Sequence, residues 1–487
     1  MSRFRRKTSK LATASAPRQQ TENPQPLATV PARTPIPKKR FVRLTLWPLV
    51  AATFFMVSGG TYGTEDIVHG AGYGRAILIL LLTPLVWSLP TAFMIGELSS
   101  ALPYEGGYYA WVRRAMGNFW GFQEAWLSLV ASIFDMAIYP TLFVAYLTRM
   151  FPWFSVNHRG WWVALAVVIA CAALNIAGVK VVSLTSLWLF FALSAPFVAI
   201  VLIAPFKIGA LVNAVTKPTT SSVDILGGLL ICMWNYMGWD NASTIATEVE
   251  KPQRTYPRAM LVAVAIVAAS YVLPFAAMWM TGLKATAWET GSWADIAGLV
   301  GGPLLRIGVV VGGVISAFGM FNALVMSYSR LPLAMAQDGM LPGIFARLQK
   351  KSRAPWVAIL ALALCWAMCL GLGFARLVTL DILLYGFSLM LEFVALAVLR
   401  FREPDLPRPF RVPGGLFGAI AIGIPPMLLL GFSILRSEHE QVWNMSSFEF
   451  GMILIAAGFV AYAVNHLLKP AGWAVRAEKP QPAAQHY

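Results

Sequence analysis

The chain has 487 residues, of which 58% are hydrophobic and only 12% are charged. An average soluble domain carries about 25% charged residues, so a soluble fold of this length would lack the charge to cover its surface. The formal net charge of +16 does not indicate nucleic-acid binding, because the basic residues lie in short segments between apolar runs and at the N-terminus. The composition therefore excludes a soluble enzyme and predicts an all-α polytopic membrane protein.

Polar segments stand at both ends of the chain. Residues 1–43 are basic and rich in proline, and they contain no apolar core of the kind that a cleavable signal peptide needs. They are predicted to form a disordered cytoplasmic tail, and residues 469–487 a second one. Residues 44–468, between the tails, are predicted to form a single membrane domain of twelve helices.

Twelve stretches of this domain are apolar over the roughly 20 residues that a helix needs to cross the hydrocarbon of a bilayer. They cover residues 44–69, 74–100, 118–148, 160–178, 181–205, 222–248, 257–281, 303–334, 355–374, 377–400, 413–435 and 447–468. An even number of spans places both termini on one side. Of the 38 Lys and Arg residues, 29 lie in the tails and loops on that side, so the positive-inside rule makes it the cytoplasmic side.

The first and the sixth stretch carry signs of an interrupted helix. The first contains 57–63 (VSGGTYG) and the sixth contains 235–241 (NYMGWDN). Glycine and small polar residues weaken a helix, and backbone groups freed at membrane depth are tolerated only where they are buried in protein or line a cavity. Close helix packing is the alternative interpretation of Gly59 and Gly60.

The position of the two breaks favours a binding site over simple packing. Residues 44–205 and 222–400 each contain five predicted spans, and the broken span is the first of each half. Because five is odd, the second half is inverted in the membrane. Interrupted helices at matching places in inverted repeats are the sequence feature that best indicates a transport site.

Several carboxylates lie within the predicted spans, where an ionisable side chain is costly and usually functional. They are Glu65, Asp66, Glu97, Glu124, Asp135, Asp240 and Glu392, with Glu248 at the inner end of the sixth span. Few Lys or Arg residues lie at comparable depth, so these carboxylates must bind protons, bind a cation or accept hydrogen bonds from hydroxyl and amide groups. The acidic interior predicts a substrate that carries at least one positive charge.

The carboxylates differ in their expected roles. Asp135, in the middle of the third span, and Asp240, at the second break, are expected to bind substrate. Glu392 is a candidate for binding a proton or an amine, with a structural link to the loop arginines as the alternative. Glu65 and Asp66 follow the first break, where they either attract cations or cap the half-helix that follows.

Glu97 and Glu124 lie nearer the predicted cytoplasmic ends of the second and third spans. They are interpreted as structural groups that pair with Arg113 or Arg114, in the loop between these spans. The aromatic residues that flank the two breaks are candidates for cation–π contacts with an alkylammonium group. They are Tyr62, Tyr236 and Trp239.

Seven motifs extend the pattern beyond the breaks. They are 57–60 (VSGG), 63–66 (GTED), 106–108 (GGY), 119–124 (FWGFQE), 239–244 (WDNAST), 248–252 (EVEKP) and 408–413 (RPFRVP), together with Trp111, Asp135, Tyr139 and Pro140. These residues resemble the amino acid–polyamine–organocation superfamily of transporters, and within it the polyamine uptake transporters best known from plants. The likeness covers roughly residues 44–468.

The resemblance implies a LeuT-like fold, in which a five-plus-five inverted repeat is followed by two peripheral helices, here within 413–468. It also implies proton symport by alternating access, with a site between spans 1, 3, 6, 8 and 10. In such transporters the backbone amides of the first break hold a substrate carboxylate where one exists. The expected substrate site comprises Ser58, Gly59, Gly60, Tyr62, Asp135, Asn235, Tyr236, Trp239 and Asp240.

The chain departs from several of these relatives in two places. The fifth span reads LFFALSA over 189–195 and lacks a lysine that stands where sodium would bind, so proton coupling must use a carboxylate, with Glu65, Asp66 and Glu392 as candidates. A sodium site made by hydroxyls of the eighth span and carbonyls of the first remains an alternative. The loop 150–160 has no cysteine, so no disulfide-linked heavy chain is expected.

These features favour one of four functions over the others. The preferred one is a proton-coupled carrier of polyamines or other cationic amines in the cell (inner) membrane, and an amino acid permease of the same fold is the alternative. A membrane-embedded enzyme is disfavoured because no HExxH, GxSxG or phosphate-loop motif occurs. A sensor would usually carry a soluble signalling domain. No cofactor or metal is expected, and Cys365 and Cys369 are interpreted as packing residues.

Overall fold

The computed structural model describes residues 45–102, 106–178, 186–214, 224–241, 243, 249–437, 440–442 and 444–467. The two predicted tails and Glu248 lie outside these residues. The helices of the first half are α1 (Leu46–Val57), α2 (Glu65–Ala71), α3 (Tyr73–Thr83), α4 (Leu89–Ala101), α5 (Gly107–Met116), α6 (Asn118–Met150), α7 (Arg159–Ala177) and α8 (Ser186–Ile203). Those that follow are α9 (Ile225–Asn235), α10 (Pro252–Met280), α11 (Trp293–Gln337), α12 (Trp356–Met368), α13 (Phe374–Arg402), α14 (Gly415–Ala421), α15 (Ile424–Ser437) and α16 (Ser447–Leu467).

Nine helical segments of the described chain are long and apolar enough to cross a membrane. The chain is therefore a multi-span α-helical membrane protein. Three of the twelve predicted stretches are not among the nine. The first is divided into α1 and α2, the sixth contributes the short helix α9, and the ninth contributes the 13-residue helix α12. The only described strands form a two-residue ladder, β1 (Gln441–Val442) with β2 (Met445–Ser446).

Proline and glycine account for the irregular helices. A π-helical turn over Pro84–Ser88 joins α3 to α4. Within α11 the backbone kinks at Gly302, which has a φ of 75° and precedes Pro303. The predicted span, 303–334, begins directly after this kink, and α11 extends about ten residues further toward the N-terminus. The predicted span 413–435 is also divided, because a turn at Gly423 precedes α15, whose first turn contains Pro425 and Pro426.

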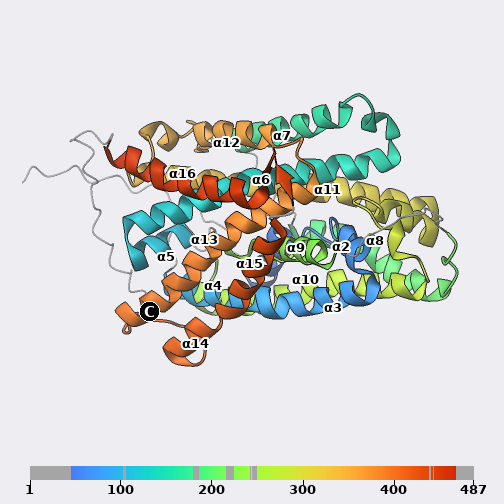
Figure 1. Ribbon diagram of the computed structural model, residues 1–487, viewed down its shortest axis with the longest axis horizontal. Coiled ribbons are helices and arrows are strands. Elements are labelled where there is room, and N and C mark those ends of the chain that lie inside the picture. The colour runs from blue at the N-terminus through green and yellow to red at the C-terminus, as the bar shows by residue number, and fades with distance from the viewer. Residues whose placement is uncertain are drawn as a thin grey trace, which may run out of the picture. The chain divides into compact units, whose positions relative to one another are not determined.

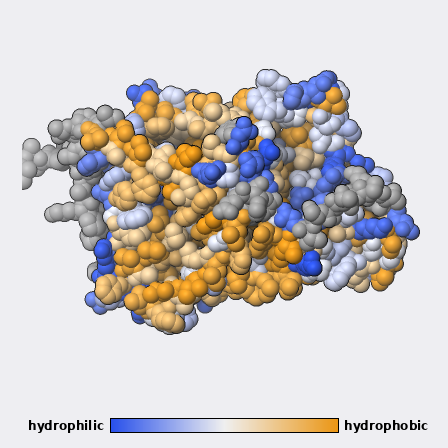
Figure 2. Space-filling view, in the orientation of Figure 1, coloured by the Kyte–Doolittle hydropathy of each residue, from blue (hydrophilic) through white to orange (hydrophobic). Residues whose placement is uncertain are grey.

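Apolar side chains cover much of the outer surface, as lipid-facing helices require. Leu304, Phe417 and Leu467 are 82, 80 and 81% exposed. Figure 2 shows a broad hydrophobic area on the face in view, with hydrophilic residues gathered toward the ends of the helices. In water such an area would be a large unprotected hydrophobic surface, so the solvent of this surface is the bilayer.

The long helix α6 is the centre of the bundle, because it packs along both α11 and α13. In Figure 1, α7 and α12 lie along the upper edge of the bundle, α3 and α10 along the lower edge, and α2 and α9 between them. The broken segments are therefore neighbours in space: α2 packs on α9, and α1 packs on α10. Both breaks also contact α6: Gly63 and Tyr62 of the first lie against Leu142 and Tyr146, and Trp234, just before the second, bonds to Asp135.

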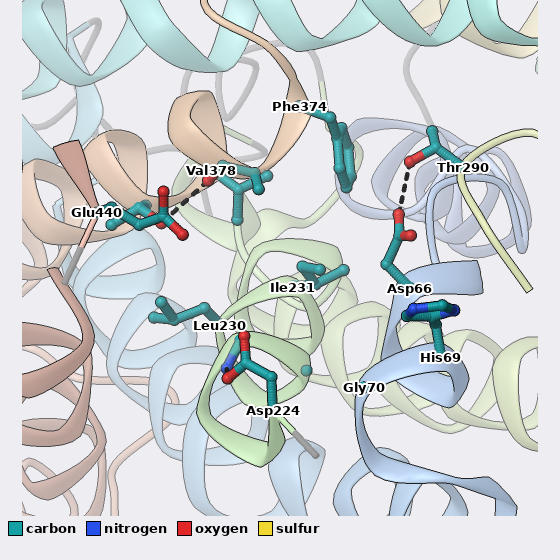
Figure 3. A pocket seen from close by; sticks show the side chains of 14 residues that line it. Asp66, His69, Gly70, Asp224, Leu230, Ile231, Thr290, Phe374, Val378 and Glu440 are labelled. Carbon is teal, nitrogen blue, oxygen red and sulfur yellow. Dashed lines mark hydrogen bonds between the residues drawn. The ribbon is translucent and has the colours of Figure 1, made fainter. Parts of the chain in front are cut away.

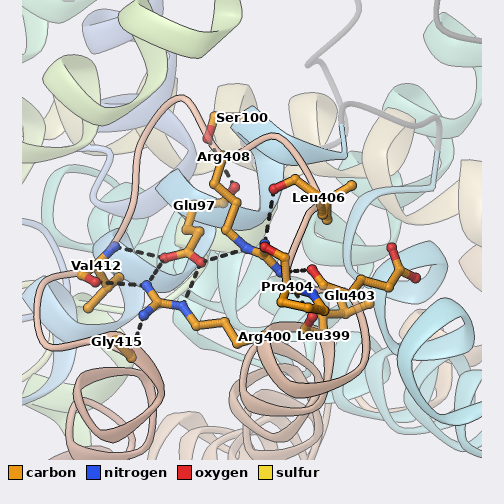
Figure 4. A network of polar contacts seen from close by, with 10 residues as sticks. All are labelled: Glu97, Ser100, Leu399, Arg400, Glu403, Pro404, Leu406, Arg408, Val412 and Gly415. Atoms are coloured by element: carbon orange, nitrogen blue, oxygen red, sulfur yellow. Dashed lines mark hydrogen bonds and ion pairs between the residues drawn. The ribbon is translucent and has the colours of Figure 1, made fainter.

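A buried ion-pair network joins α4 to the end of α13 (Figure 4). The Glu97 carboxylate accepts a hydrogen bond from Arg400 Nε at 2.8 Å and another from the Val412 backbone amide at 2.7 Å, and Arg408 Nε lies 3.2 Å away. Arg400 also donates to the Val412 carbonyl at 2.8 Å. The network fixes the loop after α13 against α4.

The predicted pairing of Glu97 and Glu124 with Arg113 or Arg114 is wrong. Arg113 forms its ion pair with Asp338, at the end of α11, and Arg114 pairs with Glu403 at 2.7 Å. Helix α5 turns both arginines toward other helices, and Glu97 meets Arg400 because α4 packs beside α13. Glu124 instead accepts hydrogen bonds from serine hydroxyls in the interior.

We expect Glu97→Gln to destabilise the protein strongly. The side chains of Arg400 and Glu97 are 1 and 0% exposed, and removal of one partner leaves a buried charge uncompensated, at a cost of about 3–5 kcal/mol. Glu403→Gln is the matched control, because its pair with Arg114 is about one-third exposed and such pairs contribute about 0–1 kcal/mol. Thermal unfolding of the purified protein measures both, and equal shifts in Tm would contradict this account.

Candidate functional site

The first break runs from Ser58 to Thr64, between α1 and α2, and glycine makes it possible. Gly59, Gly60 and Gly63 have φ values of 57°, 108° and 83°, which residues with a Cβ rarely adopt. The amides of Ser58 and Gly59 donate to the Phe54 carbonyl at 2.8 and 3.3 Å. The Gly60 amide donates to Ser58 Oγ at 3.1 Å. The three amides expected to hold a substrate carboxylate therefore already have acceptors within the chain.

Helix α11 packs closely against this break. Ser316 Oγ donates to the Gly59 carbonyl at 2.5 Å, and a Cβ on Gly59 would overlap Met320 Sδ and lie 2.7 Å from Ser316 Oγ. The ring of Tyr62 makes edge-on contacts with Tyr146 and Phe197, each with ring centroids 5.0 Å apart. Tyr62 thus belongs to an aromatic cluster between α6, α8 and the break.

The second break follows α9 and is tied to the first. Asn235 Nδ2 donates to the Gly63 carbonyl at 3.3 Å, and the Asn235 carbonyl accepts from Tyr271 Oη at 2.9 Å. Gly238 has a φ of 86°. The hydroxyl of Tyr236 donates to the Leu80 carbonyl at 2.9 Å, and Trp239 Nε1 donates to the Tyr236 carbonyl at 2.7 Å. These two predicted cation–π residues are fully buried and brace the break.

Three aromatic side chains surround Asp135 on α6. Its carboxylate accepts hydrogen bonds from Tyr139 Oη at 3.0 Å, Trp234 Nε1 at 3.2 Å and Tyr328 Oη at 3.1 Å. Only 3% of the residue is exposed. Donors from α6, α9 and α11 therefore converge on one carboxylate, which is the arrangement that keeps it in a defined orientation without a counter-charge.

Asp240, in the second break, is oriented by α13. Its Oδ1 accepts from Tyr385 Oη at 2.7 Å, and the same tyrosine oxygen accepts from the Gly238 amide at 3.4 Å. The carboxylates of Asp135 and Asp240 interact electrostatically. The structure therefore brings together the two residues that the sequence predicted as the main substrate ligands.

A third aspartate, Asp381 on α13, joins them and was missed by the sequence analysis. It is 1% exposed, and both carboxylate oxygens lack a hydrogen-bond partner among the described residues. It interacts electrostatically with Asp135 and Asp240. A signal was available, since Asp381 lies within the predicted span 377–400. It is weaker than that of Asp135, because Arg376 stands only five residues before Asp381.

Two glutamates lie further along the same helices. Glu124 on α6 accepts from Ser388 Oγ at 2.5 Å and from Ser128 Oγ at 3.3 Å. Glu392 on α13 is 0% exposed, and neither of its carboxylate oxygens has a donor in the described part of the chain. Glu392 interacts electrostatically with Glu124 and Asp240. Five carboxylates therefore share the interface of α6, α13 and the second break.

Glu65 and Asp66, at the start of α2, have different surroundings. Glu65 accepts from the Gly291 amide at 3.0 Å and from the Tyr146 hydroxyl, and Asp66 accepts from Thr290 Oγ1 at 2.5 Å. Both residues therefore hold the segment that precedes α11. The structure does not place them among the five carboxylates.

A cavity of about 420 Å³ lies between α2, α9 and the start of α13 (Figure 3). Its lining includes the acidic residues Asp66, Asp224 and Glu440, together with Phe374. The ring of Phe374 makes an edge-on contact with Trp234, with centroids 5.6 Å apart. Since Trp234 donates to Asp135, two aromatic rings separate this cavity from the buried aspartates.

Positive charge is scarce in this interior. The side chains of Arg400 and Arg408 are 1 and 5% exposed, and both pair with Glu97. Within the same residues, no group of three or more His, Cys, Asp or Glu side chains has the arrangement of a metal site. The negative charge of Asp135, Asp240 and Asp381 is therefore not compensated by a buried cation of the described chain, and the cluster is expected to bind protons or organic cations.

The model of an amino acid permease family matches residues 50–458. The chain belongs to this family, within the amino acid–polyamine–organocation superfamily. It is 35% identical to the polyamine transporter RMV1 of Arabidopsis thaliana, over 83% of this chain and 82% of the relative. It is 34% identical to the polyamine transporter PUT1 of Oryza sativa subsp. japonica (84 and 77%) and 25% identical to the serine/threonine exchanger SteT of Bacillus subtilis (76 and 84%).

Membership confirms the predicted superfamily and makes the chain a secondary transporter of the membrane and not an enzyme. The family also implies a LeuT-like fold, in agreement with the two adjacent helix breaks.

We expect Gly59→Ala to destabilise the first break. A residue with a Cβ at a φ of 57° costs about 1–2 kcal/mol, and overlap with Met320 adds about 1–3 kcal/mol. The control is Gly431→Ala in α15, where the new Cβ would meet no atom within 4 Å. Thermal unfolding should show a clear loss of Tm for the first variant alone. A Gly59→Ala protein as stable as the control would contradict the packing described here.

Proposed function

We propose that this transporter carries polyamines or other cationic amines in symport with protons, by alternating access. The observation that carries the proposal is the group of three buried aspartates, Asp135, Asp240 and Asp381, with no buried cation to compensate them in the described residues. A carboxylate in a low-dielectric interior is stable only when a proton or a cation neutralises it. An amine with several positive charges supplies what the site lacks.

The first break also favours an amine over an amino acid. The amides of Ser58, Gly59 and Gly60 all donate within the chain, so a substrate carboxylate would have to displace these bonds. The names of the plant relatives at 34–35% identity support the same substrate class. The side chains of Tyr139, Trp234 and Tyr328 already donate their hydrogen bonds to Asp135, so they are not available to a substrate carboxylate.

An amino acid permease of the same fold is the second candidate. It is favoured by the family name and by the 25% identity to a serine/threonine exchanger. In that case Ser58, Gly59 and Gly60 would rearrange to bind the substrate carboxylate, and Asp240 would bind the amino group. The remaining buried carboxylates would then serve as proton carriers or structural groups.

In the proposed architecture the chain crosses the plasma (inner) membrane of the cell twelve times. Both termini lie in the cytoplasm. Residues 44–205 and 222–400 form the inverted repeats, and two peripheral helices lie within 413–468. Helices α1 with α2, α9 and α12 supply the three crossings beyond the nine long ones. The strong bias of Lys and Arg residues supports this orientation.

The proposed substrate ligands are Asp135, Asp240 and Asp381, with the two breaks forming the walls. Tyr62, Asn235, Tyr236 and Trp239 position the breaks through the contacts described above. Glu65, Asp66 and Glu392 are the candidates for the coupling proton or for a further amine contact. Glu65 and Asp66 fasten the segment before α11, so protonation there would loosen it.

We expect purified protein in liposomes to accumulate putrescine when the proton gradient is directed inward. Asp135→Asn and Asp240→Asn should each reduce uptake roughly ten- to a hundredfold, because each variant loses a charge-assisted hydrogen bond of about 1.5–3 kcal/mol. Glu403→Gln, at an exposed ion pair, is the control and should retain uptake. A sodium gradient and an excess of a neutral amino acid complete the set.

Uptake that follows the proton gradient and resists the neutral amino acid supports the proposal. Robust uptake of the neutral amino acid without uptake of putrescine would refute it and leave the amino acid permease as the function. Uptake that follows the sodium gradient alone would keep the substrate and replace the coupling ion.

A further inference from the structure

The carboxylates of α6 and α13 are arranged around a pair of serines. Ser128 Oγ on α6 lies 2.9 Å from Ser388 Oγ on α13. On α6, Asp135 stands seven residues after Ser128, and Glu124 stands four residues before it. Because helical residues three, four and seven apart share a face, both carboxylates project from the side of α6 that carries Ser128.

Helix α13 repeats the pattern in the opposite direction. Asp381 stands seven residues before Ser388, and Glu392 stands four residues after it. Asp381 interacts electrostatically with Asp135, and Glu392 does so with Glu124. The helices are therefore antiparallel and in register, and their carboxylates form two facing pairs on either side of the serines.

The two pairs are separated along the helix axes. Asp381 and Glu392 are eleven positions apart along α13, which corresponds to roughly 16 Å at 1.5 Å per residue. Asp240 lies between them, because its partner Tyr385 is four residues, or roughly 6 Å, beyond Asp381. The result is a line of carboxylates with a pair at each end and a single one between.

Each end carries a carboxylate that lacks a partner. Asp381 and Glu392 are 1 and 0% exposed, and no oxygen of either accepts a hydrogen bond from the described residues. The titratable groups that face Glu392 are Glu124, Asp240, Tyr108 and Tyr385, none of which is a cation. Arg400, two turns further along α13, is held by Glu97. Both ends therefore accept a cation or a proton.

We propose that the two ends bind the two terminal ammonium groups of one extended linear polyamine, so that Glu124 and Glu392 form a subsite that selects tetraamines over diamines. The inference rests on the proposed function and specifies its substrate. With carbon–carbon bonds of about 1.5 Å, an extended chain with four methylene groups between its nitrogens spans roughly 6 Å. A tetraamine with three, four and three methylene groups spans roughly 16 Å.

The groups between the ends suit the internal nitrogens of such a chain. Asp240 supplies a charge, and the hydroxyls of Ser128 and Ser388 supply acceptors for a secondary ammonium group, which donates two hydrogen bonds. A diamine bound at the aspartates is too short to reach either glutamate. The glutamates therefore add affinity only for the longer amines.

The test is equilibrium binding to detergent-purified protein at one pH, with no ion gradient. The probes are putrescine, spermidine and spermine, each in competition with a labelled polyamine. We expect the wild type to bind spermine more tightly than putrescine, and Glu392→Gln to lose roughly ten- to a hundredfold in spermine affinity with putrescine affinity unchanged. Glu392→Asp is the matched control, because it keeps the charge and should keep most of the preference for length.

Putrescine binding by each variant verifies that it is folded. Equal losses for amines of all lengths, or no loss for any, would overturn the length subsite. Unchanged binding together with a loss of proton-driven uptake in Glu392→Gln would also overturn it and assign the pair to the coupling proton. Failure of the wild type to bind any polyamine would instead refute the proposed function.

Discussion

The structure depends on carboxylates that are buried without a counter-charge. Asp135, Asp240 and Asp381 lie in an apolar interior where each unneutralised charge costs several kcal/mol. The buried guanidinium groups of Arg400 and Arg408 are engaged elsewhere, in the Glu97 network. Burial without a counter-charge makes these carboxylates unstable when they are ionised and alone. For the same reason they bind protons and organic cations.

Three structural devices place these groups together. The glycines at positions 59, 60, 63 and 238 let two helices unwind beside α6. The Ser128–Ser388 contact holds α6 and α13 in an antiparallel register, and tyrosine and tryptophan donors orient Asp135 and Asp240 without adding charge. The buried ion pairs of Glu97 lie at the C-terminal end of α13, where they join α4 to the loop that follows α13. They do not neutralise the carboxylates between α6 and α13.

Local signals made the breaks, Asp135 and Asp240 predictable, because glycine clusters and isolated acids stand out in apolar runs. Asp381 gave a weaker signal, five residues after Arg376, and was missed. The partners of these residues could not be predicted: Tyr328 and Tyr385 are two of many aromatic residues, and Glu97 meets Arg400 across 303 positions of the chain. Pairing between helices depends on packing, which local sequence patterns do not specify. The segment 413–435 was predicted as one helix although Gly423, Pro425 and Pro426 are local signals of the break.

The central claim is that the protein recognises the positive charges of an amine substrate and does not require a carboxylate on it. Calorimetric titration of the wild-type protein with putrescine and with 4-aminobutanoate tests it directly, because the two molecules have similar chain lengths and differ in whether the second end is an ammonium or a carboxylate group. The account predicts binding of the diamine and none of the amino acid. Tighter binding of 4-aminobutanoate would contradict it, because a carboxylate would then be favoured inside a cluster of three aspartates.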